Sequence, residues 1–168
     1  MSRPILLSSC ARAATAAEAR FRIDMPISPS RGTRVVALDA GARPALRTVA
    51  AQQWANARFY LVPDPTGPND GWIADIRLRG LDGGEKLLSH ELADASTVVM
   101  VATSDDGAVP AAAIGEACTL RGVTTAGLIL GRHREMRAAV SALRPHARIL
   151  MVTEDERDIG EVLTALRA

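Results

Sequence analysis

The sequence is poor in aromatic residues, in cysteine and in lysine. Aromatic side chains make up 3% of its 168 residues, and Lys86 is the single lysine among 20 basic residues. A core with so few rings has to consist of Leu, Val, Ile and Ala, whose small side chains let helices lie close to a sheet. The two cysteines, Cys10 and Cys118, form neither a disulfide framework nor a zinc-binding cluster. They favour a reducing, cytoplasmic setting, with Cys118 as a buried free thiol.

Long apolar runs and an excess of charge are also missing. No apolar stretch approaches the ~20 residues that a membrane-spanning helix needs. Twenty basic and 19 acidic residues give a formal net charge of +1, which provides no general attraction to nucleic acid or to an anionic membrane. We therefore expect neither as a partner.

Several motifs that carry chemistry are absent. The sequence has no G-x-G-x-x-G dinucleotide fingerprint, no phosphate loop ending in Gly-Lys-Ser/Thr and no G-x-S-x-G nucleophile elbow. His90 and Glu91 begin an H-E pair that lacks the second histidine of a zinc site. The three histidines are scattered, so we predict no metal site and assign no cofactor.

Alternating apolar strands and Ala-rich helices dominate the rest of the chain. Residues 1–32 lack a clear period and are interpreted as an N-terminal extension or edge element, and residues 33–168 as one α/β domain. The pattern predicts a three-layer α/β/α, Rossmann-like fold with a mostly parallel sheet of five or six strands. The first strand is expected at the centre, beside 97–102. Core strands are expected at 34–38, 58–62, 97–102, 124–130 and 148–152, an extra strand at 72–78, and helices near 44–54, 85–92, 108–120, 133–143 and 155–167.

Ligands of such sheets bind where the strands end, so the turns after the strands hold the candidate site. Asp39–Arg43 follows the first strand. There Gly41 allows a backbone cradle for an anion and Arg43 offers a positive charge. The alternative interpretation is a glycine required by a tight turn and a solvated arginine.

The turn Thr103–Gly107 follows the most apolar strand. The hydroxyls of Thr103 and Ser104 near a helix start suit an anion, whereas Asp105 and Asp106 repel phosphate and cap helices well. Ligand contact and helix capping therefore both remain open for this turn.

Two families share features with this part of the chain. The segments Thr103-Ser104-Asp105-Asp106-Gly107 and Thr124-Thr125-Ala126-Gly127 resemble the tubulin-like cell-division GTPases and the phosphosugar-binding isomerase domains. The resemblance covers roughly residues 95–130. The glycine-rich phosphate signature of the first family is missing and the Ser/Gly-rich loop of the second is partly present, so no activity is carried over.

Three functions follow as hypotheses. The first is binding of a small anionic or phosphorylated, nucleotide-like metabolite. The second is a non-catalytic interaction or structural protein without a cofactor. The third is a small transferase or hydrolase that uses His133 with Asp105 or Asp106. A homodimer is also expected, through residues 63–78 or an N-terminal strand. The candidate ligand-binding residues are Asp39, Gly41, Arg43, Thr103, Ser104, Asp105, Asp106, Gly107, Arg132 and His133.

Overall fold

The computed structural model describes residues 32–63 and 76–168, which form an α/β protein with a seven-stranded, mostly parallel mixed sheet flanked by five α-helices. The strand order is β4-β3-β2-β1-β5-β6-β7. The strands are β1 (Thr33–Ala37), β2 (Ala57–Leu61), β3 (Arg77–Gly80), β4 (Glu85–Leu87), β5 (Thr97–Ala102), β6 (Thr124–Leu130) and β7 (Ile149–Thr153). The helices are α3 (Ala42–Ala50), α4 (Leu88–Ala93), α5 (Ala108–Arg121), α6 (Arg137–Leu143) and α7 (Arg157–Ala165), with 3₁₀ turns η2 (Asp105–Gly107) and η3 (His133–Glu135).

Strand β1 lies at the centre of the sheet, as predicted. It pairs in parallel with β2 and with β5, which brings Val35 opposite both Phe59 and Val99. The chain first moves outward from β1 to β2, and then returns to add β5 on the other side. The order of the parallel strands therefore reverses at β1, which is where ligand crevices form in open α/β sheets.

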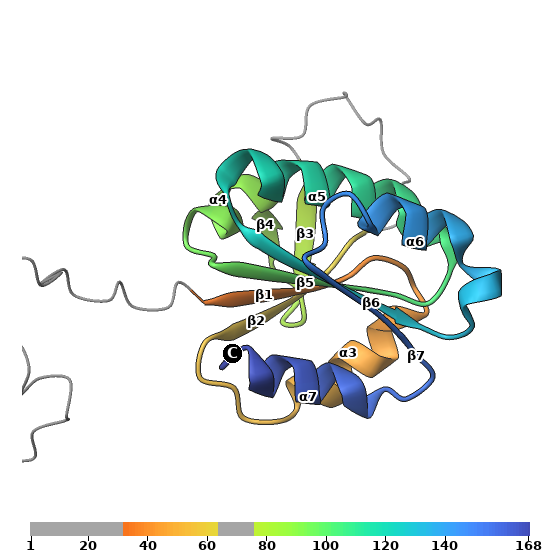
Figure 1. The fold of residues 1–168 in the computed structure, drawn as a ribbon. Helices are drawn as coiled ribbons and strands as arrows, with labels where there is room; N and C mark the ends of the chain where they lie inside the picture. Colours follow the sequence, from red (N-terminus) through yellow and green to blue (C-terminus); the bar gives the residue numbers. More distant parts are fainter. Residues whose placement is uncertain (1–31, 64–75) are drawn as a thin grey trace, which may run out of the picture.

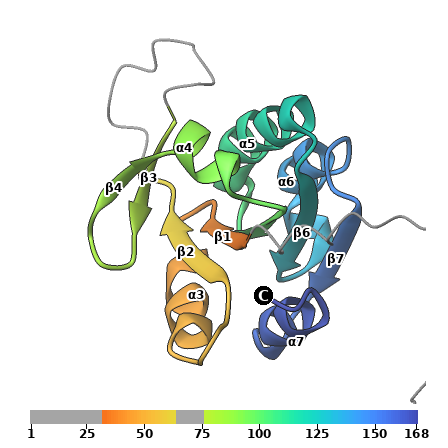
Figure 2. The ribbon, with the colours of Figure 1, turned by 90° about the vertical axis from the view of Figure 1, so that its left-hand side faces the viewer.

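Helices cover both faces of this sheet. Figures 1 and 2 show α4, α5 and α6 on one face and α3 and α7 on the other. Alternate residues of β5 serve the two cores: Met100 packs in the cluster that includes α5 and α6, and Val99 packs in the cluster that includes α3 and α7. Burial on both faces explains why these strands are continuous apolar runs rather than alternating ones.

The sheet has seven strands rather than the five or six expected from the sequence, and residues 85–87 are a strand rather than the start of a helix. An antiparallel hairpin of β3 and β4 accounts for both corrections. Gly83 adopts a positive φ of 87° in its turn, and the Asp82 carboxylate accepts a hydrogen bond of 3.0 Å from the N–H of Gly84. Tertiary pairing thus overrides the local helical pattern until Leu88. Residues 72–75 of the expected extra strand lie outside the described residues.

A buried group of polar side chains joins the sheet to α4. The Nε of Arg34 lies 2.8 Å from the Glu91 carboxylate, with both side chains less than 10% exposed. Burial would raise the pKa of Glu91, but hydrogen bonds from Tyr60 and Arg34 and the nearby positive charges lower it below its usual value. Burial, helped by the charge of Glu91, raises the pKa of Tyr60 from 10.0 to about 12.

Alkaline pH should destabilise the protein through Tyr60. Between pH 10 and pH 12 the unfolded chain releases the phenolic proton and the folded chain keeps it, so the free energy of unfolding falls as the pH rises. The full loss is roughly 2–3 kcal/mol. Because Tyr60 is the only tyrosine, the ultraviolet absorbance of phenolate measures its ionisation directly. Tyr60→Phe should make the alkaline limb shallower by the share of Tyr60, and the remaining share belongs to the buried thiol of Cys118, whose pKa is also raised. A native phenol that ionises near pH 10 would contradict the prediction.

Cys118 is buried in α5, as predicted, and burial raises the pKa of its thiol to about 12. Within residues 32–63 and 76–168, no helix has the length and apolar character needed to cross a membrane. The proposed N-terminal extension, up to residue 31, and Cys10 lie outside the described residues.

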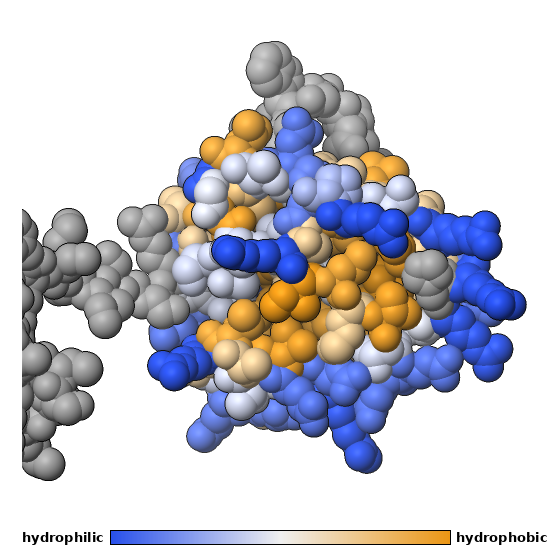
Figure 3. Space-filling view, in the orientation of Figure 1, coloured by the Kyte–Doolittle hydropathy of each residue, from blue (hydrophilic) through white to orange (hydrophobic). Residues whose placement is uncertain are grey.

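The two edges of the sheet differ in chemistry. Strand β4 is three residues long, and its Glu85 lies 3.4 Å from Arg77 of β3, so this edge carries exposed charges. Strand β7 is apolar, with Ile149 50% and Val152 37% exposed. Figure 3 shows the molecule from the side of β7, where an apolar area lies among hydrophilic side chains.

Candidate functional site

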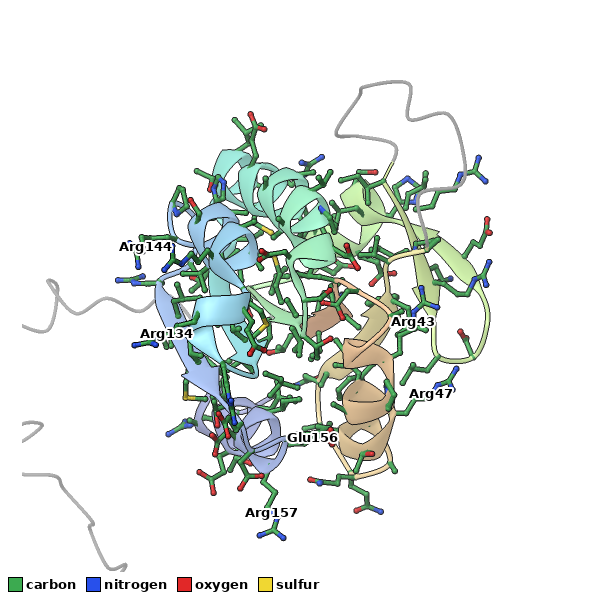
Figure 4. The ribbon with its side chains drawn as sticks, turned by 90° about the vertical axis from the view of Figure 1, so that its right-hand side faces the viewer. Arg43, Arg47, Arg134, Arg144, Glu156 and Arg157 are labelled. Atoms are coloured by element: carbon green, nitrogen blue, oxygen red, sulfur yellow. The ribbon has the colours of Figure 1, made fainter. Side chains whose placement is uncertain are left out.

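The turns after β1 and β5 meet at the end of the sheet where the parallel strands finish. Figure 4 views the molecule from this end. The N–H of Leu38, which follows β1, donates to the carbonyl of Val101 in β5 over 2.9 Å, so strand pairing continues up to the first residue of the turn. Because the helices that follow leave on opposite faces, Asp39 lies between the two turns.

The carboxylate of Asp39 binds both turns, and Asp39 is a buried residue that is 7% exposed. Its Oδ2 accepts hydrogen bonds from the N–H groups of Thr103, at 2.7 Å, and Ser104, at 3.1 Å. Its Oδ1 accepts from the Thr103 hydroxyl at 2.6 Å and from the N–H of Ala42 at 2.9 Å. Four donors from two turns converge on one anionic group, an arrangement comparable to the way backbone amides hold a phosphate.

Gly41 and Gly107 allow the two turns to approach each other. A Cβ at Gly41 would lie 2.1 Å from the Thr103 hydroxyl oxygen. A Cβ at Gly107 would lie 3.1 Å from the Cβ atoms of Leu38 and Ala102 and 3.3 Å from Oδ2 of Asp39. Both glycines therefore serve close packing around Asp39.

The remaining side chains of the second turn bond to nearby helix starts. The Ser104 hydroxyl accepts a 3.3 Å hydrogen bond from the N–H of Asp106 at the start of η2. Asp105 Oδ1 accepts a 3.0 Å hydrogen bond from the N–H of Ala139 in the first turn of α6. Asp106 is exposed. The capping interpretation thus describes the contacts of Ser104 and Asp105, while ligand contact stays a prediction.

The basic residues predicted for the site lie apart. Arg43 is half-buried, with its Nη2 3.4 Å from the carbonyl of Val62, and Arg132 lies 3.5 Å from Glu154 on the surface. Figure 4 shows Arg43 on the opposite side of this end of the molecule from Arg134, which lies two residues after Arg132 in the chain. His133 begins η3, and its side chain is outside the description. Its pairing with Asp105 or Asp106 therefore stays a prediction.

A groove of about 980 Å³ lies between α3 and α7, and none of the ten predicted residues lines it. Its lining includes Thr48 and Val49 from α3 and Gln52, which follows that helix. Four carboxylates and one guanidinium carry its charge: Glu154, Asp155, Glu156, Glu161 and Arg157. Such a lining disfavours an anionic ligand. In the part of the chain that the structure describes, no three His, Cys, Asp or Glu side chains gather as metal ligands would.

Sequence reasoning placed Asp39 in the site but missed its role. The usable signal was a lone carboxylate directly after a buried strand, at the start of the turn that leads into α3, because an Asp side chain there can accept hydrogen bonds from backbone N–H groups a few residues on. Its partners Thr103 and Ser104 are 64 and 65 residues away, and no local pattern connects them. No family model, no curated protein and no solved structure matches this chain.

Proposed function

We propose that this chain is a Rossmann-like protein-interaction domain in which the carboxylate of Asp39 takes the place of a ligand's anion. The observation that carries the proposal is the set of four hydrogen bonds that Asp39 accepts at the reversal of the strand order. Five parallel strands in the order β2-β1-β5-β6-β7, with helices on both faces, support a doubly wound sheet of the Rossmann-like class, in which they follow the flavodoxin-like order 2-1-3-4-5 rather than the dinucleotide-binding order 3-2-1-4-5-6.

A bound phosphate would meet two obstacles at this position. The N–H groups of Thr103 and Ser104 already donate to Asp39, so a ligand has to displace that carboxylate to reach them. The carboxylates of Asp39, Asp105 and Asp106 also repel an anion at the same end of the sheet. Large apolar side chains of β7, Ile149 and Val152, stay exposed instead, which supports a surface for protein contacts at this edge of the sheet.

A thermal-shift titration tests this proposal against the small-ligand hypothesis. The wild-type protein is melted with inorganic phosphate, nucleotides, dinucleotides, phosphosugars and divalent cations over a range of concentrations. We expect no rise in melting temperature with ligand concentration, because a ligand that binds the native state would stabilise it by RT ln(1 + L/Kd), where L is the free ligand concentration, and this term grows with that concentration.

Ser104→Ala and Asp106→Ala are the matched variants of this experiment. A concentration-dependent shift with one of these anions that Ser104→Ala abolishes would overturn the proposal and establish the anion site. A shift with a divalent cation that Asp106→Ala abolishes would overturn it in favour of a cation site. An unchanged melting temperature in all three proteins supports the interaction domain.

A further inference from the structure

The edge of the sheet at β7 is an unprotected strand. In the described residues β7 has β6 as its only strand neighbour. Its sequence, Ile-Leu-Met-Val-Thr, has no charge, no proline and no glycine. Natural proteins block such edges with charges, proline or bulges, and an apolar edge without them is a template for pairing with another strand.

The backbone of β7 presents hydrogen-bonding groups to its open side. The N–H of Gly131 donates to the carbonyl of Thr153 at the end of the pairing with β6, over 2.7 Å. Since the N–H and C=O groups of successive residues alternate sides along a strand, Leu150 and Val152 direct theirs away from β6. An added strand would therefore find both donors and acceptors along this edge.

We propose that β7 pairs antiparallel with β7 of a second copy of this chain, about a two-fold axis at Met151. In this register Ile149 of one copy lies opposite Thr153 of the other copy, and Leu150 lies opposite Val152 of the other copy. Arg148, just before the strand, faces Glu154, just after it. Opposite charges thus meet at both ends of the paired strands, and apolar side chains meet between them.

Other arrangements of the same strand are less favourable. A parallel pairing of two β7 strands places Arg148 opposite Arg148 and Glu154 opposite Glu154. Pairing of β7 with β4 of another copy meets a strand of three residues, of which Glu85 and Lys86 are charged, and generates an open chain rather than a closed dimer. Glu154 already lies 3.5 Å from Arg132, but both side chains are more than 70% exposed, so this pair leaves Glu154 free to turn to a second arginine.

The inference names the partner of the proposed interaction domain and rests on that proposal. It uses a different part of the chain from the segments that the sequence suggested for a dimer. Residues 64–75 and 1–31, which those segments include, lie outside the described residues. Most of the apolar edge, by contrast, is directly visible in Figure 3.

Sedimentation of the full chain over a wide range of concentration is the first test, and a dimer is expected. Val152→Lys places a charge in the middle of the paired edge. Because the two-fold axis gives the dimer two such lysines, and both lose hydration when the strands pair, the substitution should raise the dimer dissociation constant at least about tenfold. Val109→Lys is the matched control, because Val109 is 74% exposed on α5. It should leave the dissociation constant unchanged. Circular dichroism spectra and melting temperatures of both variants are measured to check that they fold.

A charge exchange tests the register. Arg148→Glu and Glu154→Arg each place like charges opposite each other and should raise the dissociation constant about tenfold, whereas the double variant restores the attraction and should return close to the wild-type value. A double variant as weak as the sum of the two singles would overturn the antiparallel register.

Two outcomes overturn the dimer itself. One is a monomer at every concentration in the wild type. The other is a wild-type monomer whose β7 amides exchange slowly with deuterium and which becomes a dimer when residues 1–31 are deleted. That result would assign the open side of β7 to the N-terminal segment of the same chain. A monomer that binds no ligand rejects this inference and leaves the proposed function standing, whereas a dimer with a saturable anion site rejects the proposed function alone.

Discussion

Asp39→Ala is expected to lower the free energy of unfolding by about 3–5 kcal/mol, as measured by urea denaturation. The substitution removes the acceptor of four hydrogen bonds at a residue that is 7% exposed. The N–H groups of Ala42, Thr103 and Ser104 then lose their acceptor. Buried donors without an acceptor cost more than the hydrogen bonds themselves contribute. Asp106→Ala, which removes an exposed carboxylate from the same turn, should cost less than about 1 kcal/mol.

Inorganic anions should partly rescue the Asp39→Ala variant. Sulfate or phosphate offers oxygen acceptors to the same donors, and at ten times its dissociation constant it would stabilise the variant by about 1.4 kcal/mol. Sulfate also stabilises proteins in general. The quantity to compare is therefore the gain in the free energy of unfolding of Asp39→Ala in excess of the gain in the wild type and in Asp106→Ala. If Asp39→Ala costs no more than Asp106→Ala, the cradle around Asp39 is not a structural element of the fold.

The second large effect is expected at the buried ion pair between Arg34 and Glu91. Glu91→Leu leaves the Arg34 guanidinium, whose side chain is 4% exposed, without its carboxylate and should cost about 3–5 kcal/mol. The double variant Arg34→Met/Glu91→Leu replaces both charges with apolar groups and should recover most of that loss. Arg58→Ala is the control, because Arg58 lies 3.6 Å from Glu91 with its own side chain 62% exposed, and should cost at most about 1 kcal/mol.

Acid pH provides an independent measurement of the same pair. The pKa of Glu91 is lower in the folded state, so its contribution to stability is complete above the ordinary pKa of glutamate and disappears as the pH falls through the folded value. The double variant should therefore lose less stability than the wild type on acidification. Equal acid limbs in the two proteins, or a double variant as unstable as Glu91→Leu, would contradict this account.

The regular half of the chain could be predicted because each of its signals is local. The apolar runs at 97–102 and 124–130 correspond residue for residue to β5 and β6. The hairpin was harder, because Glu85–Leu87 fits a helical pattern and becomes a strand through its pairing with β3. The position of the site followed from the rule that turns after parallel strands share one end of the sheet. The anchoring of Thr103 and Ser104 by Asp39 could not be predicted, because those contacts depend on which strands become neighbours.

The carboxylate that bridges the two turns has a consequence for how this protein responds to its surroundings. A domain that holds a free anion gains stability only as far as that anion is present, and loses it on dilution or when metabolite levels fall. Here the anion is part of the chain, so its effective concentration at the amides of Thr103 and Ser104 is set by covalent connection and stays constant. If Asp39 takes the place of a ligand's anion, as we propose, the two turns are preorganised at all times, and their geometry does not depend on the supply of small molecules.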